Sequence, residues 1–401
     1  MQIEPKHQSL SFTGHRWDLA VILLRGYMLM VPSLGLNRFW LTTRKRRFYW
    51  GNTEIGGDAL EYRGDAGQLL VGFLMALALF LPLYGLFFFL STQSVETILL
   101  GYGLVAVFVF FLQGYAQYRA RDFRLSRTLW RGIRFDQAGS ALRYALRRFF
   151  WSLLNIVTLG LAYPFMAASL WRYRYGNSWY GDRQFSFGGS WRQLALPYYL
   201  IWIVMAAIAL FALVSATEGG LFSDALAADP SVYGTLILPA LAALVLVTLY
   251  RAIEMTRMFS AVRLGGAALS VRMPALGLLG QYLLFALALG AAYLVLALGG
   301  FVILGIVAPE AFAGDAFDLE LLMASMQSSV TTLLAIVSGY LLLFAAFAFV
   351  SELVLGYGFW RLVVRGAAVS GLDSLDTVRA RAEDKALAGE GLADALNVGG
   401  Y

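Results

Sequence analysis

The sequence predicts an all-α polytopic membrane protein with six transmembrane helices, arranged as three repeated pairs. Hydrophobic residues make up 59% of the 401 residues, whereas only 14% are charged. Several apolar stretches approach or exceed the roughly 20 residues that a helix needs to cross a hydrocarbon core of about 30 Å. A third observation is an internal repeat, in which two polar, aromatic and glycine-rich loops follow two interrupted apolar segments.

The composition excludes several kinds of chemistry. The chain has no cysteine, which excludes disulfides, thiolate catalysis and thiolate-bound metals. Its two histidines, His7 and His15, are not in a metal-binding spacing. The first sixteen residues are polar and lack the apolar core of a cleavable signal, so we expect a mature, cytoplasmic amino terminus.

Six apolar segments are long enough to span the bilayer. They cover residues 67–91, 96–118, 192–215, 232–250, 275–308 and 326–356.

Two further apolar segments, 18–40 and 149–171, are interrupted near their middles. Residues 32–35 (PSLG) break the first segment, and residues 158–160 (TLG) with Pro164 break the second. Basic residues of short loops usually stay on the cytoplasmic side of the membrane. In this chain, all arginine-rich loops lie on one side only if both interrupted segments return to the face from which they entered. We therefore predict two re-entrant or interfacial helical hairpins, with eight full spans as the alternative.

Comparing the sequence with itself at an offset of 125 reveals the repeat. Leu34 to Leu36 align with Leu159 to Leu161, and Gly51-Asn52 align with Gly176-Asn177. The predicted units are a first repeat at 1–118, a second at 119–250, a degenerate third span pair at 251–370 and a polar cytoplasmic tail at 371–401.

Short strands are expected in the loops beside the membrane. Apolar and polar residues alternate at 10–12, 60–62, 133–135, 185–187 and 269–271, which is typical of strands. Turn-forming residues lie just upstream at 52–57 and 177–182. These patterns predict short cytoplasmic β-hairpins that pair into a small sheet; irregular interfacial loops are the alternative.

The motifs in this order resemble the YjgN-like family of bacterial inner-membrane proteins, a family of unknown function. They are Phe12-Thr13-Gly14, Ser33-Leu34-Gly35, Arg44 to Phe48, Gly51-Asn52-Thr53, Tyr62-Arg63-Gly64 and the tail Gly389 to Leu396. The resemblance implies a multi-pass protein of the bacterial inner (cytoplasmic) membrane with both termini cytoplasmic. It also implies a zinc metallopeptidase as a candidate partner, although this chain lacks the H-E-x-x-H motif of such an enzyme.

The best place for a ligand is the second break, because broken helices line transporter sites. The candidate ligand-binding residues are Asn155, Thr158, Gly160, Pro164 and, in the first interrupted segment, Arg25. Candidate residues for lipid head groups or the interface are Arg44, Arg46, Arg47, Arg172, Arg174, Trp50 and Trp171. The arginines alternatively serve only to anchor the topology. Gly51, Asn52, Gly176 and Asn177 form the structural repeat motif.

These features favour a non-enzymatic protein that transports or accommodates a lipid-like or amphipathic molecule. The alternative is a non-catalytic scaffold or regulatory subunit for a membrane partner such as a metallopeptidase. An enzyme is disfavoured because no carboxylate pair, nucleophile with a base, or metal-binding pattern is recognisable. We expect membrane lipids as partners, with no cofactor, no metal and no nucleic acid.

Overall fold

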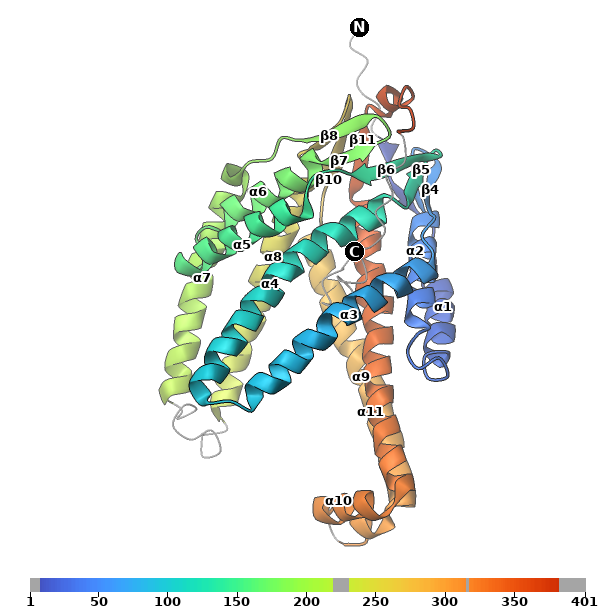
Figure 1. Cartoon of the computed structure of the whole chain (residues 1–401), viewed down its shortest axis with the longest axis vertical. Helices are drawn as coiled ribbons and strands as arrows, with labels where there is room; N and C mark the ends of the chain where they lie inside the picture. Colours follow the sequence, from blue (N-terminus) through green and yellow to red (C-terminus); the bar gives the residue numbers. More distant parts are fainter. Residues whose placement is uncertain (1–7, 219–230, 315–316, 382–401) are drawn as a thin grey trace.

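Long helices extend from a small β-sheet at one end of the molecule (Figure 1). The computed structural model describes residues 8–218, 231–314 and 317–381. Most of the predicted tail, including the motif at 389–396, lies outside these residues.

Six helical segments in the described part of the chain are long and apolar enough to cross a membrane, which confirms the six predicted spans. They are α3 (Ala66–Ser91), α4 (Val95–Leu125), α7 (Trp191–Glu218), α8 (Ser231–Phe259), α9 (Ala275–Val307), and α11 (Val330–Val350) continued by η2 and α12. The segment η2 (Ser351–Gly356) is a π-helical turn that leads into α12 (Tyr357–Arg365). Between α9 and α11 lie η1 (Pro309–Phe312) and α10 (Leu319–Ser328).

Each interrupted segment contributes to two shorter helices that pack against each other. The first pair is α1 (Arg16–Met28) and α2 (Arg38–Gly51), and the second is α5 (Ala141–Val157) and α6 (Tyr163–Gly176). None of these helices reaches the roughly 20 residues needed to cross a bilayer, because the breaks fold the chain back. The unit boundaries proposed at 118 and 250 fall inside α4 and α8.

The sheet corrects the all-α expectation. It has eleven short strands in the order β1-β11-β10-β9-β8-β7-β6-β5-β4-β3-β2, and every pairing is antiparallel. The strands are β1 (Gln8–Ser9), β2 (Ser11–Phe12), β3 (Thr53–Ile55), β4 (Asp58–Tyr62), β5 (Thr128–Trp130), β6 (Ile133–Gln137), β7 (Ser178–Tyr180), β8 (Arg183–Phe187), β9 (Val262–Leu264), β10 (Ala267–Val271) and β11 (Ala367–Ser370). All five alternating segments predicted as strands lie wholly or partly in them.

The sheet curls into a ring because one segment joins its two edges. β1 pairs with β11, β2 pairs with β3, and the amide of Leu10 between them donates to Ala367 O. Strands follow each helix pair around the ring, so each pair is attached to the ring at both ends. These eleven strands form the β ring.

Aromatic and aliphatic side chains fill the β ring. Trp130, Tyr180 and Leu264 are buried together with Leu372 and Leu375 of the following turn, η3 (Leu372–Leu375). The Tyr180 hydroxyl donates to Trp130 O at 2.9 Å. Burial raises the pKa of Tyr180 to about 12, so the phenol remains a donor at neutral pH. The β ring is therefore a packed core.

The carboxy-terminal side of β11 crosses one end of the β ring. Arg131 on the β5–β6 turn forms ion pairs with Asp58 at 2.6 Å and Asp376 at 2.8 Å. The amide of Arg379 donates to the Asp182 carboxylate, and the amide of Asp182 donates to Arg379 O. These contacts join four regions that are distant in the sequence.

The membrane-spanning helices do not form one packed bundle. In the most apolar 18-residue stretch of each of these helices, at most 17% of the residues are buried inside the protein. Close to the β ring, clusters of buried residues join neighbouring helix pairs. One such cluster contains Ala252 of α8 and Leu278 of α9. Farther out, a cluster including Ala308 and Leu322 lies within the α9–α11 region alone.

We expect Trp130→Ala to destabilise the protein strongly, because Trp130 is 3% exposed inside the β ring. Truncating a buried tryptophan costs about 3–5 kcal/mol. Thermal unfolding of the purified protein in detergent measures the effect. Trp17→Ala is the matched control because Trp17 is 75% exposed, and equal loss in the two variants would contradict the assignment of Trp130 to the core.

Candidate functional site

The second helical break, where the sequence predicts a ligand, is covered by α7. Leu159 and Gly160 adopt φ angles of 49° and 94°, which turns the chain between α5 and α6. The hydroxyls of Tyr198 and Tyr199 donate to Gly160 O at 2.7 Å and Leu161 O at 3.0 Å. The Trp202 indole donates to Leu159 O at 2.9 Å. Protein donors therefore already satisfy these three carbonyls.

The other predicted ligand residues have different surroundings. Thr158 Oγ1 donates to Leu154 O at 2.7 Å, and Pro164 is buried in the first turn of α6. Asn155 Oδ1 is shielded from solvent and has no hydrogen-bond partner, so it is the one unsatisfied polar atom among these side chains. Arg25 is exposed on α1, on the opposite side of the molecule from α5 (Figure 1), so the structure does not bring it to this break.

The first break has the same backbone turn without this cover. Leu34 and Gly35 adopt φ angles of 50° and 84°, and Gly35 N donates to Met30 O as Gly160 N does to Asn155 O. At the α3 positions 125 residues before Tyr198, Tyr199 and Trp202 stand Phe73, Leu74 and Leu77, which have no donor. A hollow of about 530 Å³ lies beside this turn, lined by Pro32, Ser33, Leu34, Leu36, Asn37 and Trp40.

Removing one donor from the covered break tests its role. Tyr198→Phe leaves the Gly160 carbonyl without its side-chain donor, so we expect a loss of about 1 kcal/mol in stability. Thermal unfolding compares it with Tyr84→Phe, in which a tyrosine that is 71% exposed loses its hydroxyl. Indistinguishable melting temperatures for the two variants would show that the contact contributes nothing measurable.

The repeated Gly-Asn motif joins a helix to a strand. The Asn52 side-chain amide donates to Phe48 O at 2.8 Å, and that of Asn177 donates to Tyr173 O at 2.7 Å. Each asparagine thus caps the carboxy-terminal end of its helix. Gly51 and Gly176, which precede them, face open space, since an added Cβ would meet no atom within 4 Å. The structural role predicted for the asparagines is therefore a specific helix-capping contact.

The residues predicted to face lipid head groups divide into two sets. Arg44, Arg47 and Arg172 are exposed. Arg46 is buried and donates to the Tyr62 hydroxyl at 2.9 Å, and the Arg174 guanidinium lies 5.0 Å from the Trp171 ring.

The tryptophans predicted at the interface are packed inside the protein. Trp50 is 8% exposed and donates to Thr128 Oγ1 at 2.9 Å, and its ring lies 5.0 Å from that of Trp360. Trp171 is 9% exposed and packs edge-on against Phe259. Both therefore contact protein rather than an open interface, since partner rings from distant helices cover them.

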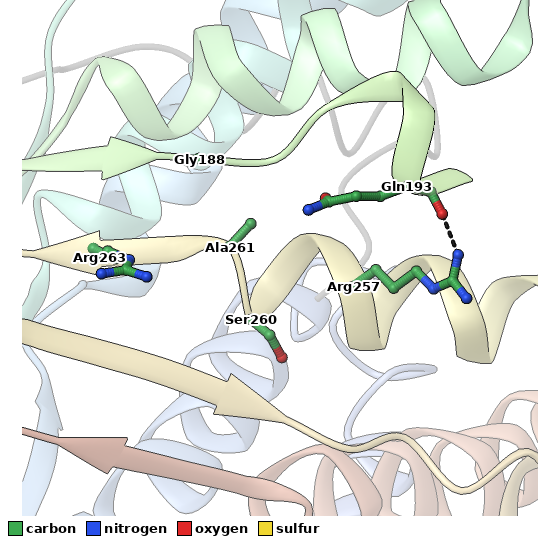
Figure 2. A pocket seen from close by; sticks show the side chains of 6 residues that line it. All are labelled: Gly188, Gln193, Arg257, Ser260, Ala261 and Arg263. Carbon is green, nitrogen blue, oxygen red and sulfur yellow. Dashed lines mark hydrogen bonds between the residues drawn. The ribbon is translucent and has the colours of Figure 1, made fainter. Parts of the chain in front are cut away.

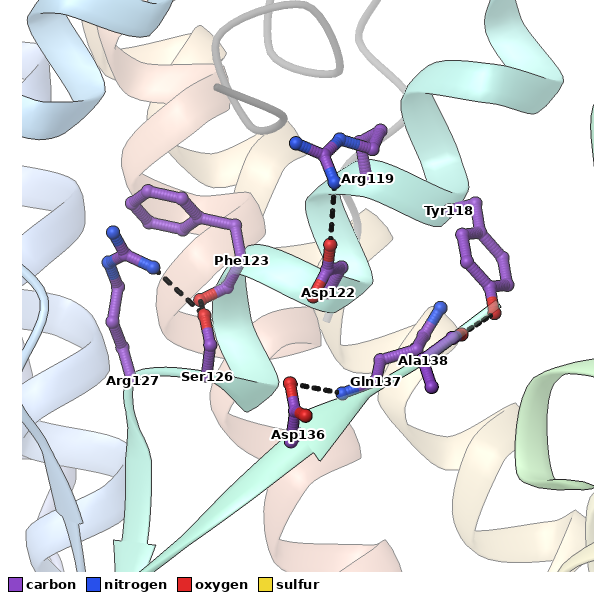
Figure 3. A network of polar contacts seen from close by, with 9 residues as sticks. All are labelled: Tyr118, Arg119, Asp122, Phe123, Ser126, Arg127, Asp136, Gln137 and Ala138. Carbon is purple, nitrogen blue, oxygen red and sulfur yellow. Dashed lines mark hydrogen bonds and ion pairs between the residues drawn. The ribbon is translucent and has the colours of Figure 1, made fainter. Parts of the chain in front are cut away.

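A polar network attaches the end of α4 to β6 (Figure 3). The Tyr118 hydroxyl donates to Ala138 O at 2.5 Å, and Arg119 forms an ion pair with Asp122 at 2.9 Å. Arg127 donates to Ser126 Oγ at 2.9 Å. The Tyr118 contact joins α4 to the residue that follows β6, whereas the two arginine contacts stay within α4 and the residues directly after it.

Two carboxylates near the ring ends of the helices are also paired. Glu254 accepts from the Tyr163 hydroxyl at 3.0 Å and lies 3.7 Å from Arg251. Glu352 lies in η2 and pairs with Lys45 at 2.8 Å while accepting from the Tyr49 hydroxyl at 2.9 Å. Both acids connect a short helix pair to a long one.

A basic hollow lies where α7 leaves the β ring and α8 returns to it (Figure 2). Its volume is about 440 Å³, and its lining consists of Gly188, Gln193, Arg257, Ser260, Ala261 and Arg263. Arg257 donates to the backbone carbonyl of Gln193. No described acidic side chain pairs with Arg257 or Arg263. Two positive charges that no described carboxylate neutralises make this hollow attractive to an anion.

Comparison with known families identifies the group to which the chain belongs. A family model described as a bacterial protein of unknown function (DUF898) matches residues 7–395. The chain is a member of the DUF898 family. This confirms the YjgN-like resemblance. No curated protein and no solved structure matches the chain.

The DUF898 family is one of unknown function, so the function is inferred from the geometry of the protein. Within residues 8–218, 231–314 and 317–381, no group of three or more His, Cys, Asp or Glu residues is placed to hold a metal ion. The hollow between α7 and α8 was not predicted from the sequence. A position-by-position comparison of the strand pairs would have singled out its two arginines.

Proposed function

We propose that this DUF898 protein accommodates a lipid-like or amphipathic molecule between its apolar helix pairs, without catalysing a reaction. The observation that carries the proposal is the separation of these pairs, whose apolar windows are at most 17% buried. Large apolar side chains such as Leu104, Phe211 and Leu298 are more than half exposed. In a bilayer, acyl chains cover such surfaces at little cost.

The ring end of the molecule supplies complementary polar chemistry. Arg44, Arg47 and Arg172 are exposed beside the apolar helices. Arg257 and Arg263, which line the basic hollow, are exposed as well. An amphipathic molecule could thus place its tails along the helices and its polar end against the arginines. Each basic residue near an anionic surface contributes about 1 kcal/mol of attraction.

A scaffold for a membrane partner, such as a metallopeptidase, is the second candidate. It is favoured by α9, in which Gly280, Gly290, Gly299, Gly300 and Gly305 have no atom within 4 Å of an added Cβ. Small residues allow another helix to approach closely in lipid. These glycines are distributed around α9, so a helix of a different chain can approach it from more than one side.

Purification from native membranes followed by mass spectrometry distinguishes the two functions. We expect one or more lipid species to be enriched over the bulk membrane extract, because the exposed apolar surface retains them. A detergent-washed sample of an unrelated six-span protein is the control. Recovery of one stoichiometric protein partner with no enriched lipid would favour the scaffold instead.

We further propose that the protein lies in the inner membrane with the β ring and both termini in the cytoplasm. Arg183 on β8 and Glu96 at the start of α4 are exposed at opposite ends of the α3–α4 and α7–α8 helices. In this cysteine-free chain, Arg183→Cys should resist an impermeant thiol reagent in spheroplasts, whereas Glu96→Cys should react. The reverse labelling pattern would refute this orientation.

A further inference from the structure

We propose that the basic hollow between α7 and α8 binds the phosphate of a glycerophospholipid head group. The inference rests on the proposed function and specifies the polar part of its ligand. Arg257 and Arg263 line the hollow together with Gln193 (Figure 2). Ser260 also lines it, but its hydroxyl is bonded to the backbone of Val271. A planar guanidinium presents paired N–H donors that match phosphate oxygens.

Both arginines lack an anionic partner within the described part of the protein. Arg257 donates to Gln193 O through one nitrogen, which leaves further N–H groups available. Arg263 is exposed on β9, and its side chain forms no hydrogen bond or ion pair with any described residue. By contrast, Arg131 and Arg119 each pair with aspartate. The positive charge of the hollow is therefore not neutralised by these surroundings.

The position of the hollow suits a lipid head group. Arg257 lies in the last turn of α8, and Gln193 lies in the first turn of α7. Beyond these turns, both helices become the apolar segments of a candidate membrane-spanning pair. A phosphate held here leaves the attached glycerol and acyl chains directed along the same apolar helices. A free phosphate ion would gain nothing from that adjacency.

The two arginines are specific to this junction of the β ring. Arg257 stands five residues before β9, and Arg263 is the second residue of that strand. At β3, the residues in these two positions are Phe48 and Glu54. At β5 they are Phe123 and Leu129, and at β7 they are Tyr173 and Trp179. The other junctions form without these charges, so the fold itself does not require them.

The volume of the hollow is appropriate for this ligand. Its roughly 440 Å³ lies within the range of about 300–1,000 Å³ found for small-molecule sites. The Gln193 side-chain amide nitrogen supplies a donor for glycerol or head-group oxygens, while its oxygen accepts from the Ser190 amide at 3.3 Å. Two cations and one neutral side-chain donor thus fit a phosphodiester with a polar substituent.

Short-chain lipids test the site on the full chain in detergent. Dihexanoyl phosphatidylglycerol is titrated against the wild type, and binding is followed by native mass spectrometry and by the shift in melting temperature. Dihexanoylglycerol, which lacks the phosphate, is the matched control ligand. Inorganic phosphate is added as a competitor of bound phosphatidylglycerol. We expect the phosphatidylglycerol to bind and raise the melting temperature, whereas dihexanoylglycerol binds at least about tenfold more weakly.

Substitutions then locate the binding. Arg257→Gln/Arg263→Gln should weaken binding of dihexanoyl phosphatidylglycerol by about tenfold or more. Arg143→Gln should leave it unchanged, because Arg143 is exposed on α5 outside the hollow. Arg257→Lys/Arg263→Lys retains the charge without the planar donor pairs. The affinity of this double variant should lie between those of Arg143→Gln and the double Gln variant. If the Gln variant unfolds, the comparison of the two ligands on the wild type still decides the phosphate requirement.

Three results would overturn the inference. They are equal affinity for the lipids with and without phosphate, unchanged affinity in the folded Gln variant, and displacement of phosphatidylglycerol by equimolar inorganic phosphate. The last result would identify free phosphate as the ligand. Enrichment of lipid on the native protein despite any of these results would leave the proposed function standing. Absence of enriched lipid would count against that function instead.

Discussion

Pairing between residues 8–12 and two distant parts of the chain controls the arrangement of the whole molecule. These residues supply hydrogen bonds to β11 on one side and to β3 on the other, so neither edge of the sheet is left open. Unpaired edges would expose unsatisfied backbone groups and invite association. Tyr357 strengthens the same closure by donating to Gly14 O at 2.9 Å, and Trp360 does so by donating to Thr53 Oγ1. The helices of each pair then start and finish at fixed places on the β ring.

The packed interior of the β ring directs attention to its outside. Because Trp130, Tyr180 and their neighbours fill the centre, ligands meet the protein along the helices and at the junctions where helices join strands. The covered break at α5–α6 shows how such a junction becomes purely structural, since α7 provides its donors. The uncovered break at α1–α2 has no such donors from α3, and its Ser33 and Asn37 side chains bond within the same turn region. In the hollow beside Arg257, neither arginine pairs with a described carboxylate.

Local patterns made part of this structure predictable. Continuous apolar runs predicted the six long helices, and alternation at positions such as 60–62 predicted strands in the correct places. Closure of the β ring could not be predicted, because Ser9 pairs with Ala368 and alternation carries no information about so distant a partner. Trp50 has the same local context as an interfacial tryptophan, and the partners that help to bury it include Thr128 and Trp360, which are distant in the sequence. Likewise, Arg257 and Arg263 resemble ordinary flanking arginines until folding places them around one hollow.

The unequal lengths of the helix pairs have a mechanical consequence for the surrounding bilayer. At about 1.5 Å per residue, the 33 residues of α9 extend for about 50 Å, whereas the 26 residues of α3 extend for about 39 Å. All pairs start from the same β ring, so one flat hydrocarbon layer cannot match each of them at the same tilt. Both lengths exceed a hydrocarbon core of about 30 Å, so both helices favour inclination or local thickening, and the longer one needs more of it, at a modest energetic cost per ångström. The protein is thus expected to deform the membrane unevenly around its circumference, which disturbs lipid packing beside the helices.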